Sequence, residues 1–397
     1  MKKIELGKLK PHIKLKKITL ILLCVNAALA LLSGICFAVC FSFPGRLQSQ
    51  FAAERWTGES ELRFEQLSCF MSERDTLGVG NIYEFRAKLT EKLTTASIEA
   101  PENGSLFSDA WSCSGKLAAY GDHGNAECSV IAAGGDYFAF HPLRLLSGSY
   151  ISEDDLMGDR VLLDRELAWR LFGGTDLQGM TVTVNNLPYM VAGVVEREQD
   201  FASEKADGEV ARMYMSYSAY NTVMGGEELS GEPIECYEIV MPQPVEGFAE
   251  DILKNDFPIG SGEIINNSGR FTFGEIFGII KQFGTRSMHT TSVIYPYWEN
   301  AARCLGDWCA LFMLLGIIFG ASPLACAFVA LMILLIRLKD YLSDNVPEWT
   351  SNALDRVRQR RYGAAQKRKQ KLLKGESRNV KGLLHKRTDS GGGSEDV

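Results

Sequence analysis

Residues 18–43 read ITLILLCVNAALALLSGICFAVCFSF, and residues 308–336 read WCALFMLLGIIFGASPLACAFVALMILLI. Neither stretch contains a charged residue or a histidine. At about 1.5 Å per residue, a helix of either length exceeds the roughly 30 Å hydrocarbon core of a bilayer. We therefore predict two transmembrane helices on either side of one large domain, residues 44–307. A cleaved signal peptide is the alternative for the first stretch, but its apolar core would span only about 7–15 residues.

Charge is distributed unevenly along this chain, whose formal net charge is −7. Residues 1–17 carry seven lysines and one acidic residue, and residues 337–397 carry 15 basic and 8 acidic residues. Because basic flanks of membrane helices stay in the cytoplasm, we expect both termini there and the middle domain outside. That domain holds 20 basic and 40 acidic residues, which argues against nucleic acid or anionic lipid as its ligand.

The middle domain has the pattern of an α+β fold. Residues 62–71 alternate like a strand, and residues 81–94 have helical periodicity. A second strand and helix follow at 236–241 and 245–255. Segments rich in short strands separate the two strand–helix units. We therefore predict an extracytoplasmic α+β domain with an inserted β subdomain.

The inserted part contains two local signals. Asp164 is a good N-cap for a helix at 165–172, which Gly173-Gly174 would end. Asn185-Asn186 is a residue pair that tolerates positive φ and suits a hairpin turn. Residues 200–208 are polar and charged, and we predict a mobile loop there.

Two of the ten cysteines are a disulfide candidate. Cys113 and Cys128 lie on either side of a predicted hairpin, with a polar turn at 121–125. If the strands pair around Tyr120-Gly121, the two thiols face each other and can oxidise outside the cytoplasm. Sequence alone does not decide that register. The cysteines in or beside the apolar stretches are interpreted as apolar membrane residues; they are Cys24, Cys36, Cys40, Cys304, Cys309 and Cys326.

One continuous region resembles a known family. The stretch RVLLDRELAWRLFG at 160–173 is followed by GMTVTV at 179–184 and PYMVAGVV at 188–195. Together with GGDYF at 134–138, these segments resemble the MacB-like periplasmic core domain in order, spacing and turn residues. The similarity runs over about residues 130–220, and the helix–domain–helix layout extends it to most of the chain.

The resemblance implies a permease subunit of the MacB/FtsX type of ABC transporter. In such proteins the outer domain divides into a porter-like α+β part and a smaller β-rich part. ATP binding by a partner moves the membrane helices, and the outer domain transmits that motion. The matching glycines and apolar residues are structural in this interpretation, and none is a catalytic candidate.

The chain also departs from the family pattern. Family permeases typically carry further membrane helices after the outer domain, but no apolar stretch follows Ile336, so we describe a two-helix version. Residues 337–374 are predicted to form a basic cytoplasmic helix, and residues 375–397 to be disordered. Within this helix Arg356, Arg358, Arg360 and Arg361 are candidates for contact with an ATPase or, as the simpler alternative, with anionic lipid.

Small residues mark candidate packing faces on both membrane helices. Ala30, Gly34 and Ala38 recur every four residues in the first stretch, and Gly316 and Gly320 do so in the second. Small side chains let membrane helices approach closely. We expect these faces to pack against each other or against a partner.

We identify no catalytic, cofactor-binding or metal-ligating residue, because no phosphate-binding loop, HExxH motif or metal-ligand spacing is present. The chain is therefore predicted to be a non-enzymatic membrane subunit without cofactor. Its expected partners are a separate ABC-type ATPase, other membrane subunits and the lipid bilayer, but not nucleic acid.

The alternative is a membrane-anchored sensor or scaffold whose acidic outer domain binds a cell-wall component or an extracytoplasmic protein. In both hypotheses the chain lies in the cell membrane, with two spans and cytoplasmic termini. The sequence leaves open the substrate, the direction of transport, and whether the chain is a homo- or hetero-oligomer.

Overall fold

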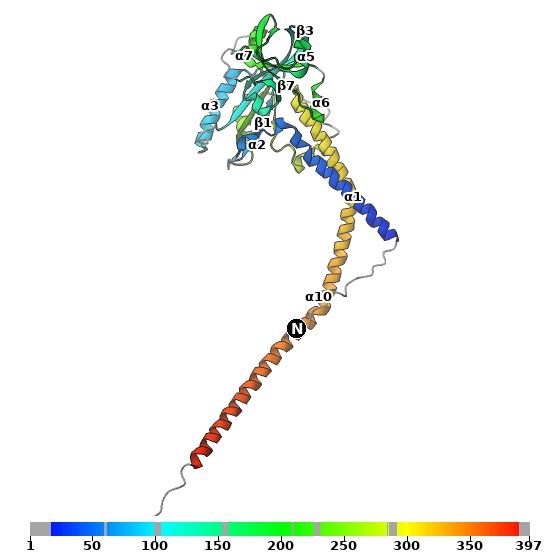
Figure 1. The fold of residues 1–397 in the computed structure, drawn as a ribbon, viewed down its shortest axis with the longest axis vertical. Helices are drawn as coiled ribbons and strands as arrows, with labels where there is room; N and C mark the ends of the chain where they lie inside the picture. Colours follow the sequence, from blue (N-terminus) through cyan, green and yellow to red (C-terminus); the bar gives the residue numbers. More distant parts are fainter. Residues whose placement is uncertain are drawn as a thin grey trace, which may run out of the picture. The chain divides into compact units, whose positions relative to one another are not determined.

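The computed structural model describes residues 17–58, 62–98, 105–152, 158–208, 210–225, 231–283, 285 and 292–388 (Figure 1). The chain divides into two compact units, Met1–Gly320 and Ala321–Val397. The predicted basic N-terminus, residues 1–17, lies outside the described residues except for Lys17. The core of the molecule belongs to the first unit.

Two helices are long and apolar enough to cross a membrane. They lie within Lys17–Arg46 and Tyr297–Tyr341. The first comprises α1 (Lys17–Ser42) and then the short helix η2 (Pro44–Arg46). The second is the first part of α10 (Tyr297–Thr388). The membrane boundaries at 18–43 and 308–336 stay predictions.

One half of the outer domain is a four-stranded antiparallel sheet with the order β10-β1-β9-β2. Its chain order is strand, helix, strand, then again strand, helix, strand, which is the split βαβ arrangement. The elements are β1 (Phe64–Phe70), α3 (Val79–Thr95), β2 (Ser108–Gly121), β9 (Cys236–Pro242), α8 (Phe248–Asp256) and β10 (Glu263–Asn266). The two predicted strand–helix units are confirmed.

The other half is inserted between β2 and β9 and forms a small closed barrel. Its strands pair in the order β2-β3-β8-β5-β7-β6, and β6 returns to pair with β2. The elements are β3 (Gly124–Gly135), β5 (Arg160–Asp164), α5 (Arg165–Phe172), β6 (Thr181–Val184), β7 (Leu187–Glu196), β8 (Arg212–Ser216) and α7 (Tyr217–Met224). β4 (Arg144–Gly148) pairs with β7 outside this ring. The predicted β-rich insertion is therefore confirmed.

Alternate residues of the sheet face two different cores. In β1, Leu67 and Cys69 join the larger core beneath α3 and α8, whereas Phe70 faces the smaller core. The smaller core also receives Trp298 from α10. Its other helical contacts are α2 (Ala52–Thr57) and α4 (Tyr137–Phe140). One face of the sheet is thus covered by its own helices, and the other by the segments next to the membrane helices.

The β2–β3 hairpin does not adopt the register that would bring Cys113 and Cys128 together. Cys113 lies opposite Ala132, and Cys128 lies opposite Leu117. Both thiols are free and buried, and burial raises the pKa of each, to about 12 for Cys128. The difference arises because a tight turn at Asp122-His123 joins Gly121 directly to Gly124, which moves the pairing four positions from the one that would bring the cysteines together.

Two further segments differ from the sequence-based expectations. Residues 200–208 contain a helix, α6 (Phe201–Asp207), because Asp200 accepts hydrogen bonds from the backbone of Ala202 and Ser203. α10 is helical to Thr388, although we predicted disorder from residue 375. Residues 375–388 contain no proline, and half of them are Arg, Lys, Glu or Leu, which favour helix. Residues 389–397 lie outside the described residues.

The local signals around α5 have the predicted geometry. Asp164 is fully buried, and its Oδ1 accepts a hydrogen bond from the backbone N of Leu167 at 2.6 Å. Its Oδ2 accepts from Arg197 Nε at 2.6 Å and from the backbone N of Arg212 at 2.8 Å. Asn185 and Asn186 have φ of 48° and 62° in the β6–β7 turn. One carboxylate therefore joins α5, β7 and β8.

We predict that Asp164→Ala strongly destabilises the outer domain. Removing one partner of a buried ion pair costs about 3–5 kcal/mol, because the remaining charge and backbone donors lose their acceptor. The measurement is urea unfolding of the full chain in mild detergent, followed by tryptophan fluorescence. Asp176→Ala, at an exposed position, is the control and should change stability by less than about 0.5 kcal/mol. Equal stability of the two variants would contradict the assignment.

Candidate functional site

The first turn of α10 contains a buried carboxylate. Glu299 is 0% exposed and accepts hydrogen bonds from both Nη atoms of Arg270, at 2.6 and 2.8 Å. Arg303, one turn later on α10, donates its Nε to Glu299 Oε1 at 2.7 Å. Arg270 also donates to the side-chain oxygen of Gln50 at 3.3 Å. We call Gln50, Arg270, Glu299 and Arg303 the root cluster.

The root cluster connects three segments that are far apart in the sequence. Glu299 belongs to α10, and Arg270 follows β10 of the sheet. Gln50 ends η3 (Gln48–Gln50), the short helix that follows α1 and η2. Both membrane helices and the sheet are therefore joined through one carboxylate and one guanidinium. Bidentate pairs of this kind fix orientation as well as distance.

The residue before Glu299 enters the smaller core of the outer domain. Trp298 lies against the ring of His141, with 4.6 Å between the ring centroids. His141 Nε2 pairs with the carboxylate of Glu238, which also accepts a hydrogen bond from Ser68 Oγ at 2.9 Å. Asn267 donates to Ser68 at 2.7 Å. A buried polar chain thus runs from the sheet to His141, whose ring lies against Trp298 in the first turn of α10.

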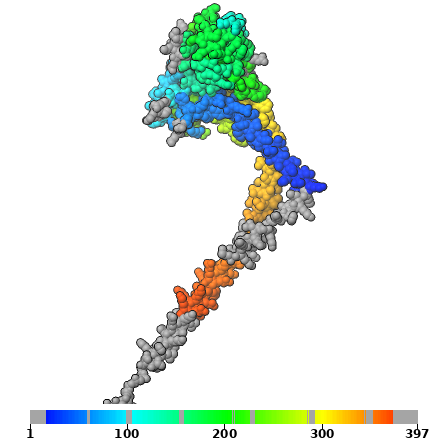
Figure 2. All heavy atoms as spheres, in the orientation of Figure 1, coloured from blue at the N-terminus to red at the C-terminus, as the bar shows by residue number. Residues whose placement is uncertain are grey.

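Next to the root cluster, an apolar cluster surrounds the ends of the two membrane helices that adjoin the outer domain, which we call their outer ends. It brings α1 and α10 together with α6 and α9 (Phe273–Gln282) of the outer domain. The buried members are Cys40, Leu47, Ala202, Ile276, Ala301, Ala302, Leu305, Cys309, Ala310 and Met313. Figure 2 shows α1 (blue) against the first part of α10 (yellow). The outer domain therefore touches the helix pair through side helices as well as through the root cluster.

The two membrane helices also contact each other directly. Ser33 Oγ donates a hydrogen bond to the carbonyl of Gly316 at 2.7 Å. A Cβ added to Gly316 would lie 3.0 Å from the ring of Phe37, and one added to Gly320 would lie 2.9 Å from Ser33 Oγ. These two glycines therefore lie at the contact between the helices.

The predicted face on α1 is not the one that contacts α10. Ala30, Gly34 and Ala38 are exposed, and a Cβ on Gly34 would meet nothing within 4 Å. The buried positions of α1 are Ser33, Cys36 and Cys40. The glycines of α10 accommodate the larger side chain of Ser33, so α1 contacts α10 without a small-residue face of its own. Packing of Ala30, Gly34 and Ala38 against a partner stays a prediction.

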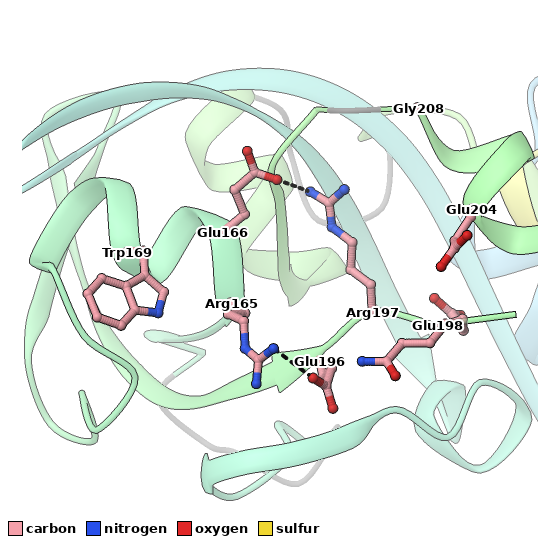
Figure 3. A pocket seen from close by; sticks show the side chains of 9 residues that line it. Arg165, Glu166, Trp169, Glu196, Arg197, Glu198, Glu204 and Gly208 are labelled. Carbon is pink, nitrogen blue, oxygen red and sulfur yellow. Dashed lines mark ion pairs between the residues drawn. The ribbon is translucent and has the colours of Figure 1, made fainter.

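A charged groove of about 530 Å³ lies on the barrel side of the outer domain. Figure 3 shows its two ion pairs, Arg165 with Glu196 at 2.9 Å and Arg197 with Glu166 at 3.7 Å. Trp169 lines the same groove and is 58% exposed.

The charged groove connects to the membrane helices through Glu198. The Glu198 carboxylate accepts a hydrogen bond from Tyr297 Oη, at the first residue of α10, at 2.8 Å. Arg212 lies over the Tyr297 ring, 3.6 Å from its centroid. Burial acts to lower the pKa of Arg212, but Tyr214, Tyr297 and Glu198 more than offset this and raise it. This guanidinium therefore stays cationic beside the start of α10.

The remaining predicted positions are surface residues. Arg356, Arg358, Arg360 and Arg361 are exposed on α10 in the second unit, so their role as ATPase or lipid contacts stays a prediction. Within the described ranges, no group of three His, Cys, Asp or Glu side chains lies close enough to hold a metal ion. The sequence analysis did not identify the root cluster, because its members share no motif. The one available signal was Glu299, a carboxylate next to Trp298 and close to an apolar stretch.

Comparison with known proteins identifies the outer domain. Residues 68–241 match the model of the MacB-like periplasmic core domain. The chain is 31% identical over 107 residues to the macrolide export ATP-binding/permease protein MacB of Chromobacterium violaceum. That match covers 26% of this chain and only 16% of the length of the relative.

Solved structures similar to this chain include two outer domains of transporters. The periplasmic region of MacB from Actinobacillus actinomycetemcomitans is 18% identical, with a TM-score of 0.38, and the match covers 56% of this chain and 94% of that one. The extracellular domain of the noncanonic ABC-type transporter YknZ from Gram-positive bacteria is 14% identical, with a TM-score of 0.35. That match covers 51% of this chain and 100% of the other.

We predict that Glu299→Gln destabilises the connection between α10 and the outer domain by about 3–5 kcal/mol, because Arg270 is left buried without its counter-charge. Thermal unfolding of the full chain in detergent is the measurement. Glu275→Gln, at an exposed position on α9, is the matched control. The double variant Glu299→Leu with Arg270→Met removes both charges and should recover part of the loss. A Glu299→Gln variant as stable as the control would contradict the role of the cluster.

We also predict that Gly320→Leu separates the two membrane helices, whereas Gly34→Leu does not. Overpacking costs about 1–3 kcal/mol, so the contact should open at least about fivefold more often. The measurement is the rate at which N-ethylmaleimide modifies the buried Cys36 and Cys40, followed by peptide mass spectrometry. The same rate in both variants would show that Gly320 does not set the approach of the helices.

Proposed function

We propose, on the premise that this chain carries a MacB-like periplasmic core domain at residues 68–241, that it is the permease-like membrane subunit of an ABC-type machine. In this proposal the subunit transmits movement between its membrane helices and its outer domain. The observation that carries the proposal is the root cluster, in which Glu299 and Arg270 join α10 to the sheet and to the segment after α1.

The strength of this connection supports transmission of movement. Glu299 is fully buried and its carboxylate accepts three charge-assisted hydrogen bonds. Separating such a pair in a water-excluded site costs several kcal/mol. A tilt or rotation of α10 at its outer end is therefore more easily accommodated by moving the outer domain than by breaking the cluster.

A second contact constrains how the outer domain moves. Ala202 of α6 and Ile276 of α9 pack on the helix pair within the apolar cluster. Glu198, just before α6, bonds to Tyr297 at the start of α10. A displacement of the helices would therefore also reach the charged groove, where Trp169 is exposed. This path connects the membrane to a surface on which an extracytoplasmic protein could be contacted.

The energy source in this proposal is a separate ATPase on the cytoplasmic side. α10 continues through the basic positions Arg356, Arg358, Arg360 and Arg361 as an exposed helix. The basic flanks of both apolar helices favour cytoplasmic termini. The same basic helix would also attract anionic lipid, at about 1 kcal/mol per basic residue, so an ATPase contact and a lipid contact must be separated by experiment.

The chain itself performs no chemistry in this proposal. Macrolide export belongs to the name of the relative from C. violaceum, and we assign no transported substrate to this chain. The subunit would use conformational change alone, in an assembly with other membrane subunits.

We predict that deletion of residues 341–374 abolishes co-purification of an ATPase in mild detergent, because the coupling helix is lost. Deletion of residues 375–397 is the matched control and should retain the ATPase. Glu299→Gln should also retain it, since the root cluster lies in the outer domain. Replacing the four arginines by glutamine while keeping the helix distinguishes loss of charge from loss of length.

Retention of the ATPase after deletion of 341–374, or recovery of the full chain without any ATPase, would overturn the proposal. If the tail deletion is tolerated but charge reversal in the outer domain abolishes function, the sensor or scaffold hypothesis is correct instead.

A further inference from the structure

Two cysteines from different membrane helices meet at the outer ends of those helices. Cys40 lies in the last turn of α1, and Cys309 lies on α10, 269 positions away in the sequence. Both are 0% exposed and belong to the same apolar cluster. Cys309 Sγ donates to the backbone carbonyl oxygen of Cys40 at 3.3 Å, so the two residues are in direct contact.

We propose that Cys40 and Cys309 are a redox-active pair that forms a reversible disulfide between the two membrane helices. Sequence alone does not pair them, because each has the setting of an ordinary apolar membrane residue. The fold brings them together through the contacts of Ser33 with Gly316 and of Phe37 with the same glycine. This proposal rests on the geometry of the helix pair and does not depend on the proposed function.

The pair lies at the ends of the helices that adjoin the extracytoplasmic domain. Cys40 is two residues before Ser42, where α1 ends, and Cys309 is two residues after the exposed Asp307. At a rise of about 1.5 Å per residue, each cysteine lies about 3 Å along its helix axis from the neighbouring polar position. The adjoining domain is extracytoplasmic, and disulfides form and persist on that side of a membrane. An oxidant from the outer compartment therefore has a short path to the pair when the helix ends open briefly.

The reaction is a thiol–disulfide exchange with a small disulfide or a disulfide oxidoreductase as the oxidant. The thiolate of one cysteine attacks a sulfur of the oxidant and releases one thiol, which gives a mixed disulfide. The second cysteine then attacks the mixed disulfide, forms the Cys40–Cys309 bond and releases the second thiol. Two electrons and two protons pass from the protein to the oxidant, and a dithiol reductant reverses both steps.

Other cysteines near the pair are placed differently. Cys36 lies on the same face of α1, one turn deeper in the apolar stretch. Cys304 lies five residues before Cys309, and the charges that act on it come from Lys205, Asp307 and Asp200, so it faces the α6 side. Cys24 and Cys326 are exposed on their helices. These residues serve as internal controls for the pairing.

The bond would join the outer ends of α1 and α10. The chain between Cys40 and Cys309, which includes the outer domain, would then form a closed covalent loop. The helices would then be unable to separate at that level, while their other ends stay free to move. Oxidation would thus restrict relative movement of the two helices, and reduction would restore it.

The test is disulfide mapping of the full chain in native membranes. The membranes are treated with oxidised glutathione, the free thiols are blocked with N-ethylmaleimide, and tryptic peptides are analysed without reduction. Trypsin leaves Cys40 in the peptide 18–46 and Cys309 in the peptide 304–337. We expect these two peptides to be linked, and the link to disappear after treatment with dithiothreitol.

Single substitutions identify the residues in the link. Cys40→Ser and Cys309→Ser should each abolish the linked peptide, whereas Cys36→Ser and Cys304→Ser should keep it. Cys40→Ala and Cys309→Ala give the same comparison with an apolar replacement if serine disturbs the packing. A link that persists in Cys40→Ala, or the absence of any link in oxidised wild-type membranes, would overturn the proposal.

Discussion

The burial of one carboxylate constrains how the outer domain and the membrane helices are joined. Glu299 is fully removed from solvent at the start of α10, and an ionised carboxylate in that position is tolerated only when it is paired and hydrogen-bonded. Its partners come from the segment after β10 and from α10 itself, and Arg270 extends the contact to Gln50. The arrangement of the three segments is therefore determined together, because moving any one of them would leave a buried charge without its partner.

Buried polar residues on the sheet also restrict how α10 packs. Glu238 and Ser68 lie on the face of the sheet that also carries the apolar Phe70 and Val240, and Asn267 directly follows β10. If these polar residues were apolar, α10 could pack on the sheet in several ways. The bond between Glu238 and His141, which lies against Trp298, selects one of them. Buried polar groups are often kept at a cost in stability because they select one arrangement among several of similar energy. In this chain the selected arrangement is the angle at which α10 leaves the sheet.

The parts of the fold that could be predicted depend on interactions between neighbouring residues. The buried face of α3, the cap at Asp164 and the turn at Asn185-Asn186 are encoded within a few positions. The register of the β2–β3 hairpin is not encoded in this way. Its two-residue turn places every residue pair four positions away from the register that would pair Cys113 with Cys128. Likewise, the sequence shows small residues on both membrane helices, but only the packed structure shows that Ser33, rather than Gly34, faces Gly320. The root cluster joins positions 50, 270 and 299, and no local pattern predicts a contact over such separations.

The contact between α10 and the outer domain is stronger than the hydrogen bond that joins the two membrane helices. The root cluster is a buried ion pair whose disruption costs about 3–5 kcal/mol. Within the apolar stretch, the hydrogen bond from Ser33 to Gly316 is of a kind that averages about 0.6 kcal/mol in membrane proteins. A force applied to α10 would therefore loosen the contact between the helices before it separated α10 from the sheet. The spacing of the two helices can therefore change while α10 stays attached to the outer domain, and this difference in strength supports the transmission of movement that we propose.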